Sequence, residues 1–195
     1  MMTGALAYLL ETVFHLFVLA ALLRFYMQVL RAPFRNPFAV FVVALTDFLV
    51  KPLRRVIPGF GGLDLASIVV AWLVEIFLLV LLVLLKHKGF PDGMSIPALL
   101  FLAFVVLIRL SIYLLIAAVL VQAILSWVSP YHPMMPLFDT LTKPFLRPVR
   151  KVLPLVGGVD LSPLVVLIVC QLVLMVPVFW LEETTRSVLF NPLAG

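Results

Sequence analysis

The chain has 195 residues, of which 65% are hydrophobic and 12% are charged, and its mean hydropathy is +1.26. An ordinary soluble domain is about half apolar and about a quarter charged, so this composition excludes a soluble globular protein. The net charge of +5 does not indicate nucleic-acid binding, because the basic residues flank apolar runs instead of forming one soluble patch. The single cysteine, Cys170, excludes a disulfide framework.

The first half of the chain, residues 1–96, contains two apolar runs that are long enough to cross a membrane. A bilayer core needs roughly 20 apolar residues, which predicts spans over residues 5–30 and 65–85. Residues 37–50 are apolar but too short to span. They predict an interfacial or re-entrant helix, which is ended or kinked by Pro52 because proline lacks the backbone N–H.

The second half, residues 97–195, has the same plan. We expect spans over residues 98–128 and 161–181 and a short helix over residues 137–146. The two acidic residues that follow Leu181 are predicted to end the fourth span. The fold class predicted is therefore all-α, with four transmembrane helices and two short helices in two parallel repeats.

One segment occurs in both halves. Residues 45–65 read LTDFLVKPLRRVIPGFGGLDL, and residues 141–161 read LTKPFLRPVRKVLPLVGGVDL. The two copies align without a gap at an offset of 96 residues. Prolines and glycines turn the chain, and the aspartate that follows them suits the N-cap of the next span. The residues with these structural roles are Pro58, Gly61, Gly62, Asp64, Pro154, Gly157, Gly158 and Asp160.

The loops that carry the repeated motif are strongly basic, whereas the opposite loops hold few basic residues. The positive-inside rule therefore predicts that the motifs are cytoplasmic and that both termini are periplasmic. Four motif cations, Arg54, Arg55, Arg150 and Lys151, are candidates to bind anionic lipid head groups or a protein partner. A purely topological role for these cations is the other interpretation.

Five polar residues inside the predicted spans are candidates for intramembrane contacts: Glu11, His15, Glu75, Arg109 and Gln171. Glu75 and Arg109 are at similar depths in neighbouring antiparallel spans, which predicts that they pair. Gln171 occupies the position equivalent to Glu75, and we expect its partner in the first span, where Glu11 and His15 share one helical face. The alternative interpretation is an ion or proton path through Glu11, His15, Glu75 and Arg109.

The doubled motif, together with RAPFRNPF and LSWVSP before its two copies, resembles the YggT (YlmG) family of integral membrane proteins. The resemblance covers nearly the whole chain, with one YggT repeat in residues 1–96 and another in residues 97–195. It implies a bacterial inner-membrane protein whose relatives are linked to osmotic-shock tolerance and to assembly roles. The family offers no catalytic residue to transfer to this sequence.

The sequence shows no catalytic constellation, no phosphate-binding glycine loop and no metal-ligand pattern. We therefore expect no cofactor and no bound metal. The predicted function is a non-enzymatic membrane scaffold or assembly factor that supports osmotic tolerance and engages anionic lipid or a protein partner, with homo-oligomerisation as a further expectation. The alternative is an oligomeric channel or transporter for ions or osmolytes.

Overall fold

The computed structural model of the chain describes residues 2–34, 36–57, 59, 64–87, 89–91, 93–129, 131–153 and 160–190. Within these residues the structure is helical and has no strand, which confirms the all-α fold class. The elements in chain order are α1 (Met2–Val29), α2 (Pro37–Arg54), α3 (Leu65–His87), α4 (Ile96–Val128), α5 (Met135–Val152), α6 (Ser162–Val173), the π-helical segment η1 (Leu174–Val178) and α7 (Phe179–Phe190).

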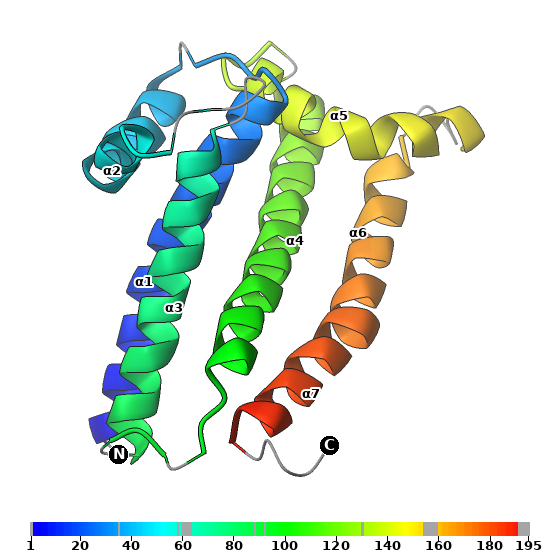
Figure 1. Cartoon of the computed structure of the whole chain (residues 1–195). Coiled ribbons are helices and arrows are strands. Elements are labelled where there is room, and N and C mark those ends of the chain that lie inside the picture. The colour runs from blue at the N-terminus through cyan, green and yellow to red at the C-terminus, as the bar shows by residue number, and fades with distance from the viewer. Residues whose placement is uncertain are drawn as a thin grey trace.

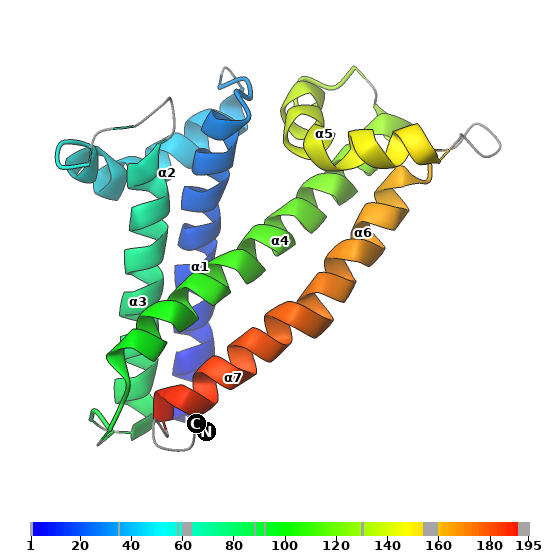
Figure 2. The same ribbon diagram turned by 45° about the vertical axis from the view of Figure 1, so that its right-hand side comes forward.

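Among the described residues, four helical segments are long and apolar enough to cross a membrane. They are Thr3–Val29, Leu65–His87, Ile96–Val128 and Ser162–Phe190, and they correspond to the four predicted spans. α4 has 33 residues, which exceeds the roughly 20 that a bilayer core requires. In Figure 2 this helix is inclined to α1 and α3, so its extra length is accommodated by tilt.

The long helix α4 joins the two repeats. Leu107 and Leu110 of α4 belong to one buried cluster with Leu22 of α1. Further along α4, Val119 packs in a second buried cluster with Cys170 of α6. α1 and α3 lie side by side over most of their length, whereas α6 and α7 lie on the other side of α4 (Figures 1 and 2).

Both short helices lie across the same end of the bundle, which we call the motif end (Figure 1). α1 begins and α7 ends at the opposite end (Figure 2). α2 begins at the predicted proline, and the Asn36 side chain caps it by accepting a hydrogen bond of 2.8 Å from the Ala39 amide. The two short helices lie crosswise to the spans at their ends, which is the arrangement of interfacial helices.

The short helices are longer than predicted, since each has 18 residues. Pro52 does not end α2, which continues to Arg54, and α5 likewise contains Pro144 and Pro148. A proline removes its own N–H bond and crowds the carbonyl four residues before it, but the residues that follow can still form their own helical bonds. Of the two predicted effects of Pro52, the stop is therefore wrong, and Arg54 and Arg150 belong to the short helices.

The fourth span also continues beyond its predicted end. α7 runs past Glu182 to Phe190, after the π-helical segment that contains Pro177. Glu182 is buried, with 8% of its surface exposed, because it contacts a cation on α4. A paired carboxylate is tolerated within a helical bundle, so this charge does not end the span.

Candidate functional site

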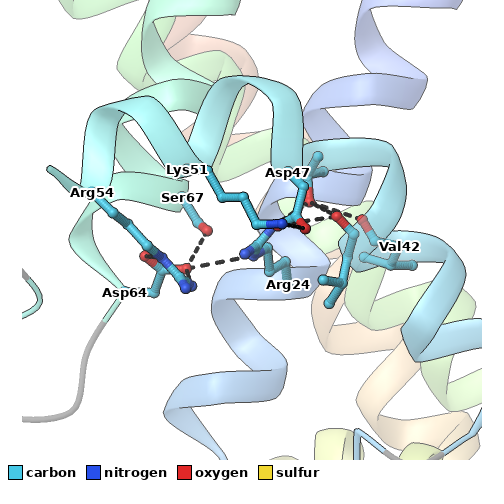
Figure 3. A network of polar contacts seen from close by, with 9 residues as sticks. Arg24, Val42, Asp47, Lys51, Arg54, Asp64 and Ser67 are labelled. Carbon is cyan, nitrogen blue, oxygen red and sulfur yellow. Dashed lines mark hydrogen bonds and ion pairs between the residues drawn. The ribbon is translucent and has the colours of Figure 1, made fainter.

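The motif end of the first repeat is held by a buried arginine of α1. Arg24 has only 4% of its surface exposed, and its Nη1 donates hydrogen bonds to Thr46 Oγ1 at 2.8 Å and to Asp47 Oδ1 at 2.9 Å, both on α2. Its Nε lies 3.6 Å from Oδ2 of Asp64, immediately before α3. Figure 3 shows that this one guanidinium lies between the two carboxylates. Arg24 therefore joins α1, α2 and the start of α3.

Asp64 is the second centre of this network, with 2% of its surface exposed. It accepts hydrogen bonds from Arg54, at the end of α2, and from the hydroxyl of Ser67, in the first turn of α3 (Figure 3). Burial raises the pKa of Asp64, but the hydrogen bonds from Arg54 and Ser67 and the charges of Arg54 and Arg24 outweigh it. The pKa of Asp64 consequently lies below its ordinary value, and the carboxylate is ionised.

On the outer side of α2, Asp47 also binds Lys51, with 2.7 Å between the carboxylate and Nζ. The hydrogen bond from Lys51 lowers the pKa of Asp47, and the contacts with Arg24 lower it further against the effect of burial. The first repeat thus contains three cations and two carboxylates in one connected network, and each of these cations has an anionic partner (Figure 3).

The second repeat keeps only part of this arrangement. Arg150 Nε lies 2.7 Å from Oδ2 of Asp160, which repeats the Arg54–Asp64 pair ten residues apart in the chain. Asp160 Oδ1 also accepts a hydrogen bond of 2.9 Å from the Ser162 amide at the start of α6. Burial raises the pKa of Asp160, but the hydrogen bonds from the Ser162 amide and Arg150 outweigh it and leave the pKa below its ordinary value.

Asp64 lies immediately before α3, at the predicted cap position, whereas α6 has Leu161 at its N-cap and Asp160 lies one residue earlier. Asp160 binds the first amide of α6, and Asp64 binds the hydroxyl of Ser67 in α3. The sequence did not indicate that each aspartate also binds an arginine of the preceding short helix. The turn residues Pro58, Gly61, Gly62, Pro154, Gly157 and Gly158 lie outside the described residues.

The four candidate binding cations divide into two kinds. Arg54 and Arg150 are bound to carboxylates, so their role at the motif end includes joining helices. Arg55 and Lys151, the next residue in each copy, are exposed and form no ion pair with any described residue. Of the four candidates, Arg55 and Lys151 therefore carry the free positive charge.

Inside the spans, Glu75 and Arg109 do not pair. His15 Nε2 lies 3.5 Å from Oε2 of Glu75, which is 1% exposed, whereas Arg109 Nη1 lies 2.7 Å from Oε1 of Glu182. Equal depth in the membrane was not sufficient for pairing, because the two side chains point in different directions. Glu75 faces α1. Arg109 lies one turn from Ile112, on the side of α4 that faces the fourth span. The predicted Glu75–Arg109 pair is wrong.

Gln171 also lacks the partner predicted in the first span. It is exposed, and α6 lies on the far side of α4 from α1 (Figure 2). Glu11 is half-buried on α1, one turn before His15, as its spacing predicted. The repeats therefore have different polar contacts at mid-span, even though their helices correspond in sequence.

Three residues that form these contacts were missed as site residues in the sequence: Arg24, Asp47 and Glu182. A cation within an apolar run is a signal for Arg24, since such residues usually have a partner inside the bundle. The threonine that recurs as Thr46 and Thr142 is a second signal, because both are fully buried on the inner faces of the short helices. Asp47 has no such signal, since its equivalent in the second copy is a lysine.

The fold and its ionic contacts define a class of protein: a multi-pass helical membrane protein built from two parallel repeats, each with a short helix joined by an arginine–aspartate pair to the following span. The model of the CCB3/YggT family matches residues 3–85 and 101–181. The chain belongs to the CCB3/YggT family.

Curated relatives match almost the whole chain. It is 40% identical to an uncharacterized protein of Pseudomonas aeruginosa over 171 residues, which cover 87% of this chain and 86% of that protein. It is 38% identical to an uncharacterized protein of Vibrio alginolyticus, over 86% of this chain and 90% of the relative. The uncharacterized protein YggT of Escherichia coli is 37% identical over 87% of each chain. No solved structure matches the chain.

Proposed function

We propose that this protein is a non-enzymatic scaffold or assembly factor of the bacterial inner membrane, with its motif end in the cytoplasm and both ends of the chain in the periplasm. The basic residues concentrated at the motif end support this orientation, because positively charged loops are retained in the cytoplasm. A reporter fused after residue 195 tests it. Activity of a periplasmic reporter is expected, and a cytoplasmic signal would reverse the orientation.

One observation carries the scaffold proposal: the motif has different uses in the two repeats. In the first repeat every charged motif residue except Arg55 is bound in a network that joins α1, α2 and α3. In the second repeat, cations on α5 remain exposed and unpaired among the described residues. We name Lys143, Arg147 and Lys151 the cationic face of α5. A rigid ionic joint next to a free cationic face suits a protein that holds a negatively charged partner at the membrane.

Growth after osmotic upshift tests this function in a bacterium that lacks its own family member. We expect the chain to restore growth and K143Q/R147Q/K151Q to lose that ability. The matched control is K51Q. Lys51 is equivalent to Arg147 in the first repeat, but its charge is already neutralised by Asp47. Full restoration by the triple variant would contradict the scaffold proposal, provided that both variants reach the membrane at equal levels.

A transport function is the second candidate, and Glu75 favours it. The carboxylate lies near the middle of α3, and its buried Oε2 has no hydrogen-bond partner among the described residues, although His15 is 3.5 Å away. Buried ionisable groups in spans often mark ion or proton paths. Ion flux into liposomes that contain the purified protein separates the two candidates. Selective flux that is lost in E75Q would overturn the scaffold proposal, and absence of flux supports it.

A further inference from the structure

The charged positions of the two short helices differ in a way that changes what each helix presents. Asp47 on α2 is replaced by Lys143 on α5, and the buried Arg24 of α1 is replaced by Leu120 of α4. The network of the first repeat has three cations and two carboxylates, namely Arg24, Lys51, Arg54, Asp47 and Asp64. The equivalent positions of the second repeat hold three cations, one carboxylate and a leucine, namely Lys143, Arg147, Arg150, Asp160 and Leu120. Since Arg150 already binds that carboxylate, Asp160, the other two cations have no counter-charge at these positions.

The cationic face of α5 is a continuous stripe. Lys143, Arg147 and Lys151 are four residues apart, so they lie on one side of the helix. All three are exposed, and none forms an ion pair with a described residue. Asp139, one turn before Lys143, is half-buried and does not pair with it. The residues that α5 buries against the bundle lie on the opposite side of the helix, namely Leu137, Leu141, Thr142 and Leu146.

α5 lies across the ends of α4 and α6, at the level where spans leave the hydrocarbon core (Figures 1 and 2). Aromatic side chains lie close to it in the chain: Trp127 at the end of α4 is 71% exposed, and Tyr131 is 99% exposed. Tryptophan and tyrosine are enriched at the head-group level of membranes. α5 is therefore at the level expected for phospholipid head groups.

We propose that the cationic face of α5 binds the head groups of anionic phospholipids, in a site that the first repeat has lost through Asp47. Arg147 suits a phosphate because its planar guanidinium donates two parallel hydrogen bonds, and Lys143 and Lys151 add positive charge on either side. This inference rests on the proposed function, since both use the same face. It is more specific, because it commits the surface to lipid and not to an acidic protein.

The comparison of the repeats supplies a matched test. The purified full chain is given equal amounts of phosphatidylglycerol and phosphatidylcholine, and the bound lipids are counted by native mass spectrometry. The wild-type chain should prefer phosphatidylglycerol. R147Q should reduce that preference roughly fivefold, which corresponds to about 1 kcal/mol for one charge near the membrane surface. K51Q, which removes a neutralised cation in the first repeat, should change it less than twofold.

K143D tests the role of the diverged position directly. It installs the carboxylate of the first repeat one turn before Arg147, where Asp47 binds Lys51 at 2.7 Å. K143D should reduce the preference more than R147Q does, because it removes one charge and neutralises a second. All substituted side chains are exposed, and equal helical content and melting temperature verify that each variant is folded.

Three outcomes would overturn the inference: no preference for phosphatidylglycerol in the wild-type chain, equal losses in R147Q and K51Q, or an unchanged preference in K143D. Equal losses would indicate a diffuse charge effect instead of a site on α5. An acidic peptide, polyglutamate, separates this inference from the proposed function. One result would refute the lipid site and leave the scaffold proposal standing: the wild-type chain binds the peptide, R147Q abolishes this binding, and the chain shows no preference for phosphatidylglycerol.

Discussion

Arg54 and Asp64 are ten residues apart in the chain, and they pair across the motif turn between α2 and α3. The same relationship recurs between Arg150 and Asp160, at the same separation. In both repeats the last turn of the short helix is therefore held to the first turn of the next span. An ion pair at this position ties the end of the short helix to the start of the next span, which accounts for arginine and aspartate in both copies of the motif.

The two copies of this pair should differ in strength. Asp64 is 2% exposed and shared with Arg24, whereas the side chains of Arg150 and Asp160 are 40% and 28% exposed. D64N should lower the free energy of unfolding by roughly 3 kcal/mol, because it removes a buried carboxylate that binds Arg54 and Ser67 and leaves the buried Arg24 with Asp47 alone. D160N should cost about 1 kcal/mol or less. Denaturant titration of the detergent-solubilised protein measures both, and equal losses would contradict the different burial of the two sites.

Three of the carboxylates at the motif end predict sensitivity to acid. The pKa values of Asp47, Asp64 and Asp160 are all lowered from the ordinary value of 3.8. A carboxyl group whose native pKa is lowered stabilises the folded state at pH values above 3.8, and this contribution is lost as the pH falls through the native pKa. The melting temperature should therefore hold near neutral pH and fall below about pH 4.

The control for this acid sensitivity is the variant D47N/D64N/D160N, which cannot gain protons at these sites. It should be less stable at neutral pH and should lose less further stability on acidification. If its melting temperature falls as steeply as that of the wild-type chain, other groups are responsible for the acid sensitivity.

The intramembrane pairs predict a clear pattern of energetic coupling. Arg109 contacts Glu182 at 2.7 Å, so a double-mutant cycle with R109Q and E182Q should give a coupling free energy of about 1–3 kcal/mol. Glu75 and Arg109 have different partners, so the effects of E75Q and R109Q should add to within about 0.5 kcal/mol. A strong coupling between Glu75 and Arg109 would contradict this prediction and would support a direct contact between these two residues.

Glu75 should also respond differently from Glu182 when it is replaced by an apolar residue. Its buried Oε2 has no hydrogen-bond partner in the described part of the chain, so the carboxylate gains little from its surroundings. E75L should leave the melting temperature unchanged or raise it, since a buried polar atom without a hydrogen-bond partner costs free energy that an apolar side chain does not. E182L should lower it, because Arg109 and Arg186 both lose their partner. A loss in E75L as large as that in E182L would show that the His15 contact is strongly stabilising.

Much of the fold could be predicted from the sequence because its signals are local. The four spans and two short helices follow from the lengths of apolar runs, and the two repeats follow from the identical positions in residues 45–65 and 141–161. The ends of helices were less predictable. Pro52 and Glu182 look like stop signals, yet both lie inside helices, because the residues after a proline can still form their own helical bonds and a paired carboxylate can remain within a bundle.

The sequence by itself determined that the protein is a duplicated membrane protein whose motif cations gather at one end, since hydropathy and repetition are properties of the linear chain. Only the tertiary structure decided which charges meet. Depth along a span is one coordinate, whereas pairing also depends on helix rotation and on the crossing of neighbouring helices. The rotation and crossing of the helices bring Glu75 against His15 and Arg109 against Glu182. They also place Arg24 between two carboxylates, while the cationic face of α5 remains unpaired among the described residues.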